Sequence, residues 1–186
     1  MTSSQTTRPG WLARLRRLVL HRWHDDRLAR TIPAGLSQRL AQQVTASEQR
    51  HSGQIRICIE GGLPGSYLWR GASARERAVT QFGKLRVWDT EHNNGVLIYV
   101  LLAEHAIEIV ADRGLARRVP AATWQAMMER MRKAFQARRY EEGLQQALDE
   151  VTDLLVQHFP AGSAQGPGAE LARSSNELPD APVIGR

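Results

Sequence analysis

Three short stretches of the chain carry the hydrophobic pattern of β-strands. In residues 54–60 an isoleucine occupies every second position, which predicts a strand with its isoleucines on one face. Residues 96–103 are continuously apolar, as expected for a strand covered on both faces. Residues 106–111 alternate again after a two-residue turn. The last two stretches are therefore predicted to form an antiparallel hairpin.

Five other stretches repeat apolar residues every three or four positions, as amphipathic helices do. These predicted helices cover residues 10–24, 33–53, 72–87, a segment that begins at Pro120, and 140–158. Methionines recur on one face of the helix that begins at Pro120, and such a stripe is typical of core packing. The succession of helices and strands predicts an α/β fold with a small mixed sheet.

The predicted strand order places several polar segments at one edge of the sheet. The first two strands are joined through a helix, so we expect them to run parallel with a right-handed crossover. The third strand runs antiparallel, so that its end meets the starts of the other two. Eight polar residues adjoin these strand ends and form the candidate site: Glu48, His51, Asp89, Glu91, Asn93, Asn94, Asp112 and Arg113.

The residue types in this set suggest an ion or a phosphate group as the ligand. Carboxylates at close range repel one another, and carboxylate and amide oxygens suit a hard cation such as Ca²⁺ or Mg²⁺. A single histidine without thiolates argues against a structural zinc site. Arg113 can instead offset the negative charge or hold a phosphate. A purely structural role stays open, because Asp and Asn also cap helices and shape turns.

Positive charge is concentrated at the start of the chain. The formal net charge is +6, from 25 Lys and Arg against 19 Asp and Glu. Residues 1–24 hold five arginines and no acid, so the remaining residues hold 20 bases and 19 acids. A nearly neutral domain argues against nucleic acid as the partner. The single cysteine, Cys58, excludes an intramolecular disulfide framework.

Residues 1–30 are predicted to form a basic amphipathic N-terminal helix. Tryptophan stands at both ends of its apolar side and arginine occupies the rest, which is typical of a helix that lies among lipid headgroups. Docking of the same apolar side on the protein's own domain, or on a second subunit, is an equally supported interpretation. The predicted membrane or partner face consists of Trp11, Leu15, Leu18, Val19 and Trp23, with Arg14, Arg16 and Arg17.

The remaining sequence bounds the domain and its location. The longest uncharged apolar run has eight residues, far fewer than the roughly 20 that span a bilayer. The start of the chain also lacks the apolar core of a secretory signal. We therefore expect a cytoplasmic protein, either in solution or peripheral to the inner face of the membrane. Residues 161–186 are rich in Gly, Pro, Ala and Ser and are predicted to be disordered, which leaves residues 31–160 as the folded domain.

Three segments in succession resemble the TPM-domain family. They are SEQRHSGQI at 47–55, NNGVLI at 93–98 and IEIVADRGL at 107–115, and the resemblance extends from about Leu36 to Pro160. The segment at 47–55 resembles the helix-to-strand signature of the family's short bacterial branch, and we expect neither a signal peptide nor a C-terminal transmembrane helix.

This resemblance implies a three-layer α/β/α sandwich. It also implies either weak acid phosphatase activity or an accessory role for membrane complexes, with calcium at the loop end that matches Asp89 to Asn94 and Asp112. Asn93 and Asn94 stand where acidic residues are common in the family, which weakens the expected calcium affinity.

Two hypotheses from different classes follow. The first is an accessory TPM-domain protein attached through residues 10–24 to a membrane surface or a membrane-protein partner, with a possible pocket for a divalent cation or phosphate. The alternative is a weak metal-assisted phosphomonoester hydrolase that uses the loop-end residues. A homo-oligomer in which the N-terminal helix makes the subunit contact is a third possibility.

Overall fold

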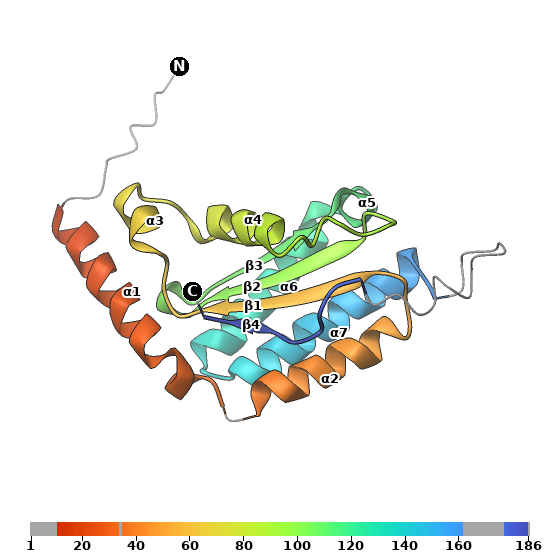
Figure 1. Ribbon diagram of the computed structural model, residues 1–186, viewed down its shortest axis with the longest axis horizontal. Coiled ribbons are helices and arrows are strands. Elements are labelled where there is room, and N and C mark those ends of the chain that lie inside the picture. The colour runs from red at the N-terminus through yellow and green to blue at the C-terminus, as the bar shows by residue number, and fades with distance from the viewer. Residues whose placement is uncertain (1–10, 34, 162–176, 186) are drawn as a thin grey trace, which may run out of the picture.

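The computed structural model describes residues 11–33, 35–161 and 177–185 (Figure 1). Its strands are β1 (Gln54–Glu60), β2 (Gly95–Leu101), β3 (Ala106–Ala111) and β4 (Val183–Ile184). Its helices are α1 (Trp11–Thr31), α2 (Leu36–Glu48), α3 (Gly65–Trp69), α4 (Ala74–Lys84), α5 (Arg113–Ala116), α6 (Ala121–Gln136) and α7 (Tyr140–His158), with a 3₁₀ turn, η1, at Leu102–Glu104.

The four strands form one mixed sheet in the order β3-β2-β1-β4. β1 and β2 run parallel, with Gln54 opposite Gly95 at their starts. β2 and β3 run antiparallel, with Val96 opposite Ala111. These pairings confirm the predicted crossover and hairpin. The starts of β1 and β2 and the end of β3 therefore meet at one end of the sheet.

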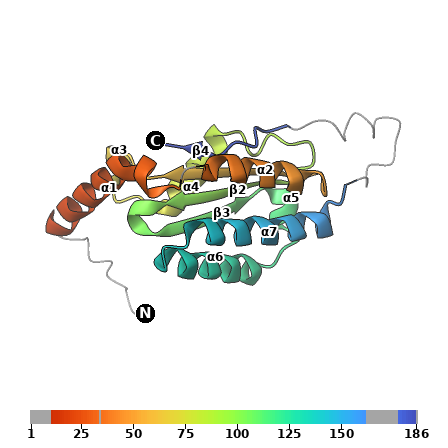
Figure 2. The same cartoon turned by 90° about the horizontal axis from the view of Figure 1, so that it is seen from below.

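Helices cover both faces of this sheet, as Figures 1 and 2 show. On one face, the isoleucines of β1 pack with Leu40 of α2 and with residues of α6 and α7. On the other face, Cys58 and Tyr99 pack with Ala78 of α4 and Leu68 of α3. Strand alternation directs successive residues to these two layers. The three-layer α/β/α sandwich is thus confirmed, with α1 at one end of the sheet.

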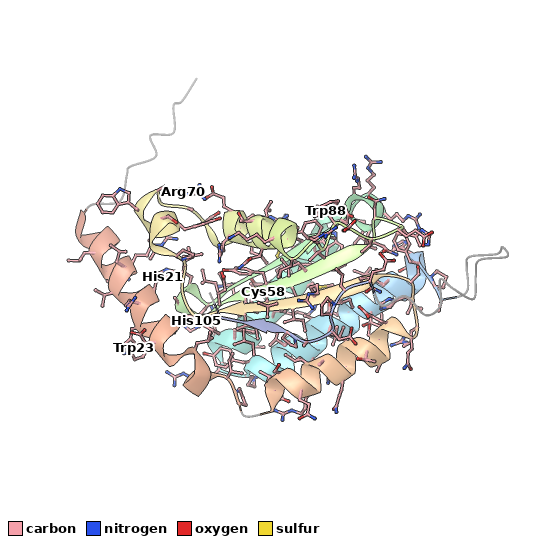
Figure 3. All side chains as sticks on the ribbon, in the orientation of Figure 1. His21, Trp23, Cys58, Arg70, Trp88 and His105 are labelled. Atoms are coloured by element: carbon pink, nitrogen blue, oxygen red, sulfur yellow. The ribbon has the colours of Figure 1, made fainter. Side chains whose placement is uncertain are left out.

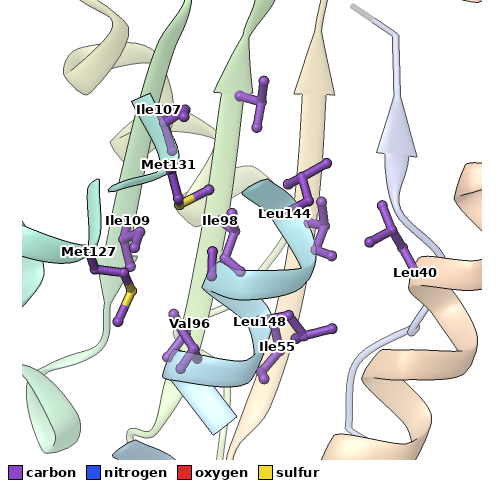
Figure 4. Packing of buried hydrophobic residues seen from close by; sticks show 14 of the residues in the cluster. Leu40, Ile55, Val96, Ile98, Ile107, Ile109, Met127, Met131, Leu144 and Leu148 are labelled. Carbon is purple, nitrogen blue, oxygen red and sulfur yellow. The ribbon is translucent and has the colours of Figure 1, made fainter. Parts of the chain in front are cut away.

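The methionine stripe of α6 belongs to the larger core, as expected. Met127 and Met131 lie close to Ile109 and Ile107 of β3 (Figure 4). Leu148 of α7 lies in the same layer. Full burial of a side chain of this size contributes roughly 1.5–3 kcal/mol to folding, so this layer is a substantial part of the apolar core.

The prediction of a disordered C-terminal tail is wrong for residues 177–185. Val183 and Ile184 form β4, which pairs parallel with Cys58 and Ile59 of β1. Leu178 is buried in the smaller core cluster. The amino-acid composition did not reveal this segment, because one buried leucine and two paired residues are enough to attach a chain to the edge of an existing strand. Residues 162–176 of the predicted tail lie outside the described residues.

The segment between β1 and α4 also differs from the prediction. No helix was predicted between residues 60 and 72, yet the short helix α3 begins at Gly65. The next helix begins at Ala74, where Ser73 and Glu76 form a capping box that satisfies free N–H groups of its first turn. α2 ends at Glu48, several residues before the predicted end near Gly53.

Candidate functional site

Two polar loops lie side by side at the end of the sheet, one before β2 and one after β3. The N–H of Asp112 donates to the carbonyl of Gly95 at 2.8 Å, and the N–H of Gly114 donates to the carbonyl of Asn93 at 2.9 Å. A Cβ atom on Gly114 would lie 2.4 Å from the Asn93 carbonyl oxygen, so the close approach requires glycine. Arg113 Nε donates to Asn93 Oδ1 at 3.2 Å. We call this contact between residues 93–95 and 112–114 the loop junction.

The loop junction contains two buried oxygen atoms that accept no hydrogen bond from any described residue. Asn94 is 1% exposed and Asp112 is 8% exposed. Asn94 Nδ2 donates to Ser52 Oγ at 3.4 Å, while Asn94 Oδ1 is unpartnered. Asp112 Oδ1 accepts from the N–H of Arg113 at 2.7 Å and caps α5, while Asp112 Oδ2 is unpartnered. Buried acceptors without donors are unfavourable, and oxygen atoms of this kind suit a hard cation.

A cationic pocket adjoins the loop junction. Arg118 is held there, because its Nη1 donates to the carbonyl of His158 at 2.6 Å and its guanidinium lies 4.4 Å from the centre of the Phe159 ring. Three arginines line one concave surface, and arginine is well suited to bind an anion such as phosphate. The pocket has a volume of about 290 Å³ and is lined by His92, Asn93, Arg113, Gly114, Arg117 and Arg118.

The structure assembles only half of the predicted site residues. Asp89 is exposed and pairs with Arg86. Glu91 is also exposed, and its backbone N–H donates to the carboxylate of Glu177 at 3.1 Å. Within the described ranges, no group of three or more His, Cys, Asp or Glu side chains is placed to hold a metal ion. The residues that meet at the loop junction are Asn93, Asn94, Asp112 and Arg113.

Glu48 is engaged with β1 and the C-terminal segment instead. Its Oε1 accepts from the N–H of Ile55 at 2.9 Å. Burial raises the pKa of Glu48 to about 8 against the lowering effect of the Ile55 bond, and the neighbouring Asp180 carboxyl adds to the rise. Glu48 therefore keeps its proton at neutral pH and can donate to a carboxylate beside it.

His51 is buried in a hydrogen-bonded link between α2 and α7. Its Nδ1 donates to the carbonyl of Gly53 at 3.1 Å, and its Nε2 lies 2.9 Å from the Ser47 hydroxyl. Ser47 Oγ in turn lies 2.6 Å from Thr152 Oγ1. Burial lowers the pKa of His51 to about 4, which the Gly53 bond only partly opposes. These contacts give His51 a structural position.

The second predicted site, on α1, faces its own domain with polar side chains. Arg17 Nε donates to Glu104 Oε1 at 2.8 Å, and Arg17 Nη2 donates to the carbonyl of Ala72 at 2.7 Å. The N–H of Leu63 donates to His21 Nδ1 at 2.9 Å. His21 Nε2 lies 3.0 Å from Glu104 Oε1 and must carry the proton of the neutral ring. Burial would raise the pKa of Glu104, but its bonds to His21 and Arg17 outweigh that effect and lower it.

This docking leaves part of the apolar side of α1 exposed. Leu18 and Leu28 pack against the domain. Leu15 is 51% exposed and Val19 is 63% exposed. Figure 3 shows His21 on the inner side of α1 and Trp23, which is also exposed, on the outer side. The predicted face is therefore divided between an inner and an outer surface, and Leu15, Val19 and Trp23 form what we call the outer face of α1.

The remaining residues of the predicted α1 face add little to this picture. Arg16 is exposed, as a headgroup contact requires, whereas Arg17 is committed to Glu104. The side chains of Trp11 and Arg14 lie outside the described residues. Among the described helices, including α1, none combines the length and apolar character needed to cross a membrane.

Sequence reasoning missed a buried polar network between the sheet and α4. Glu60 accepts hydrogen bonds from Arg77 Nε at 2.8 Å, Gln81 Nε2 at 2.6 Å and the Tyr99 hydroxyl at 2.7 Å. Burial raises the pKa of Tyr99 further above its ordinary range. The available signal was the spacing of Arg77 and Gln81, which are four apart on a helix that otherwise faces the core. The network is closed within the domain and presents no free group to a ligand.

The fold and the loop junction define a class: a three-layer α/β protein whose paired loops carry a polar site at one end of a small mixed sheet. The family model for the TPM domain matches residues 27–154, so the chain belongs to the TPM-domain family. The NMR structure of the BA42 protein from the psychrophilic bacterium Bizionia argentinensis sp. nov. is similar, with a TM-score of 0.68 and 22% identity. That match covers 83% of this chain and 95% of BA42, and it shows the shared fold. No functionally curated protein matches the chain.

Proposed function

We propose that this TPM-domain protein is an accessory module that attaches peripherally to the cytoplasmic membrane surface through the outer face of α1. The observation that carries the proposal is the orientation of α1. Arg17 and His21 hold it on the domain, while Leu15, Val19 and Trp23 follow one another at i, i+4 and i+8 on the exposed side. A helix docked by its polar residues has its apolar stripe available for another surface.

Lipid headgroups suit this face better than water does. Insertion removes apolar area from water at roughly 25 cal/mol per Å². Arg16 and Arg22 are exposed on the same helix, and each cationic residue near an anionic leaflet contributes about 1 kcal/mol. An indole such as that of Trp23 is well suited to the interface, because it has an apolar body and one polar N–H.

Sedimentation with vesicles of phosphatidylglycerol and phosphatidylcholine tests this proposal. We expect the full chain to sediment with these vesicles and V19E to lose at least about tenfold in partitioning, since it replaces an apolar contact by a charge that anionic lipid repels. V79E is the matched control, because Val79 is 50% exposed on α4. Equal binding of V19E and V79E, or no binding by the full chain, would refute membrane attachment through this face.

A second candidate function is supported by the loop junction: metal-assisted hydrolysis of a phosphomonoester. Asp112 Oδ2 and Asn94 Oδ1 fit a hard cation such as Ca²⁺ or Mg²⁺, with backbone oxygens or water as further ligands. A bound cation would polarise a phosphate oxygen. Arg113 and Arg117, which line the adjoining pocket, would orient the phosphate and balance the negative charge that develops on it.

The variant D112N separates ligand binding from folding here, because Asn caps a helix about as well as Asp. We expect calorimetry to show Mg²⁺ or Ca²⁺ binding to the wild-type chain and at least about tenfold weaker binding to D112N. Any phosphatase activity should fall with it. D149N, which changes an exposed acid on α7, is the control. Cation binding or activity that survives D112N unchanged would exclude this site.

A further inference from the structure

The edge of β1 is covered by a segment that uses only part of it. β4 pairs with two residues of β1, Cys58 and Ile59, out of the seven residues in that strand. Nearer the start of β1, the Gln54 side chain replaces a backbone ladder: its Oε1 accepts from the N–H groups of Glu177 at 3.1 Å and Leu178 at 3.0 Å. The C-terminal segment, residues 177–185, is thus held at a few points and not along a continuous ladder.

One of these points is built for a carboxylate. Asp180 accepts a hydrogen bond from the hydroxyl of Thr45 and also interacts with the carboxyl of Glu48. Arg56 supplies the positive charge on this side of β1. Since Glu48 Oε1 is occupied by the N–H of Ile55, its second oxygen is the one that can present a proton to the carboxylate. A hydroxyl, a protonated carboxyl and a guanidinium therefore surround one acidic side chain.

The C-terminal segment satisfies this surface incompletely. Arg56 is 6% exposed, and its Nε has no hydrogen-bond partner among the described residues. Its Nη1 donates to the carbonyl of Ala181 at 3.3 Å, near the long limit for such a bond. A buried guanidinium donor without an acceptor is unfavourable. An occupant that supplied an acceptor to this Nε would satisfy a donor that the protein's own segment leaves unpaired.

We propose that the edge of β1 is a docking site for an extended acidic segment of a partner protein, and that residues 177–185 are an exchangeable occupant of that site. The partner segment would add a parallel strand to β1, as in other cases of β-strand addition. It would place an apolar residue where Leu178 is buried and, two positions later, a carboxylate among Thr45, Glu48 and Arg56.

The chain is connected in a way that permits this exchange. Pro160 and Ala161 are bound beside His51 and Arg50, and Glu177 is bound to Gln54, so both ends of the intervening 15 residues lie near the start of β1. The β1 edge can therefore lose its occupant without disturbing α7. Competition from an attached segment lowers the apparent affinity for a partner by the fraction of molecules in which the edge is open.

A fluorescent peptide with the sequence of residues 177–185 is the probe, and the full-length variant with L178A and D180A is the receptor. The two substitutions weaken the attached segment and leave β1 intact. Fluorescence anisotropy should show at least about tenfold tighter binding of the peptide to this variant than to the wild-type chain. The receptor with D149A, an exposed acid elsewhere, should bind the peptide as weakly as the wild type does.

A second peptide, with Asn in place of Asp180, tests the carboxylate site. We expect it to bind the variant with L178A and D180A at least about fivefold more weakly, because one charge-assisted hydrogen bond is lost. Absence of saturable binding to the variant, with its near-ultraviolet spectrum unchanged, would overturn the proposal, and so would equal affinity for the Asp and Asn peptides. The wild-type chain could instead form a dimer at high concentration that the D180A variant does not form. That result would assign the site to a second copy of this chain and overturn the partner assignment.

Discussion

Replacement of Glu48 by Gln should change how the stability of the protein depends on pH. The pKa of Glu48 rises from 4.5 to about 8 on folding, chiefly through burial. The folded state therefore holds a proton that the unfolded state has lost, so the contribution of Glu48 to stability is present below pH 4.5 and is lost as the pH rises through about 8. The amide of Gln can accept from the N–H of Ile55 and donate to Asp180, and it does not titrate.

His51 has the opposite effect on the pH dependence of stability, and it acts at lower pH. Its pKa falls from 6.5 to about 4 on folding, so stability is lost as the pH falls below 6.5. Between pH 4.5 and 6.5 the opposite effects of Glu48 and His51 nearly cancel. Between pH 6.5 and 8 only Glu48 acts, at about 1.4 kcal/mol per pH unit, which gives a loss of about 2 kcal/mol for the wild-type chain.

Urea unfolding followed by tryptophan fluorescence at pH 6.5 and pH 8 measures this difference. We expect the wild type to lose about 2 kcal/mol between the two pH values and E48Q to lose almost nothing. E142Q, which removes an exposed carboxylate paired with Arg139, should follow the wild type. Equal pH dependence in the wild type and E48Q would refute the assignment of a buried, protonated Glu48.

Three further results are expected. E60A leaves Arg77 buried without its partner and should lower the free energy of unfolding by about 3–5 kcal/mol in urea titrations; a change below about 1 kcal/mol would contradict the buried network. H21A removes the acceptor of the Leu63 N–H and should expose α1 to faster hydrogen exchange, while unchanged protection would show that other contacts hold the helix. Burial raises the pKa of Cys58 to about 12, so its thiol should resist Ellman's reagent at neutral pH until the protein unfolds; prompt reaction of the native chain would contradict this.

Helix α1 and the C-terminal segment are attached to the domain by similar means. Arg17 and His21 join α1 to Glu104, and Gln54 and Arg56 join the C-terminal segment to β1. Both attachments rest on a few polar contacts and limited apolar burial, whereas α6 and α7 are held by a large apolar core. The proposals for membrane attachment and for partner binding therefore concern the parts of the molecule that are least strongly fixed to it.

The loop junction was only partly predictable. Strand order alone placed the segments at 93–95 and 112–114 together, because parallel and antiparallel pairing fix which strand ends meet. Glu48 was assigned to the same site because α2 ends nearby, but the direction of its side chain depends on the N–H of Ile55 and on Asp180. Asp180 lies 132 positions after Glu48 in the sequence. Hydrophobic periodicity cannot predict a contact between residues so far apart.

By itself, the sequence determined the layers of the fold, the order of the central strands and the family, since hydrophobic periodicity and short connections constrain these properties locally. Only the tertiary structure decided which side of α1 is exposed and that the C-terminal segment closes the sheet. Arg17 was predicted to belong to the membrane or partner face, yet Arg17 and His21 face the domain, where they contact Glu104 and the N–H of Leu63. Specific polar partners distant in sequence overrode the apolar pattern, and they left Leu15 and Val19 on the outer face of α1.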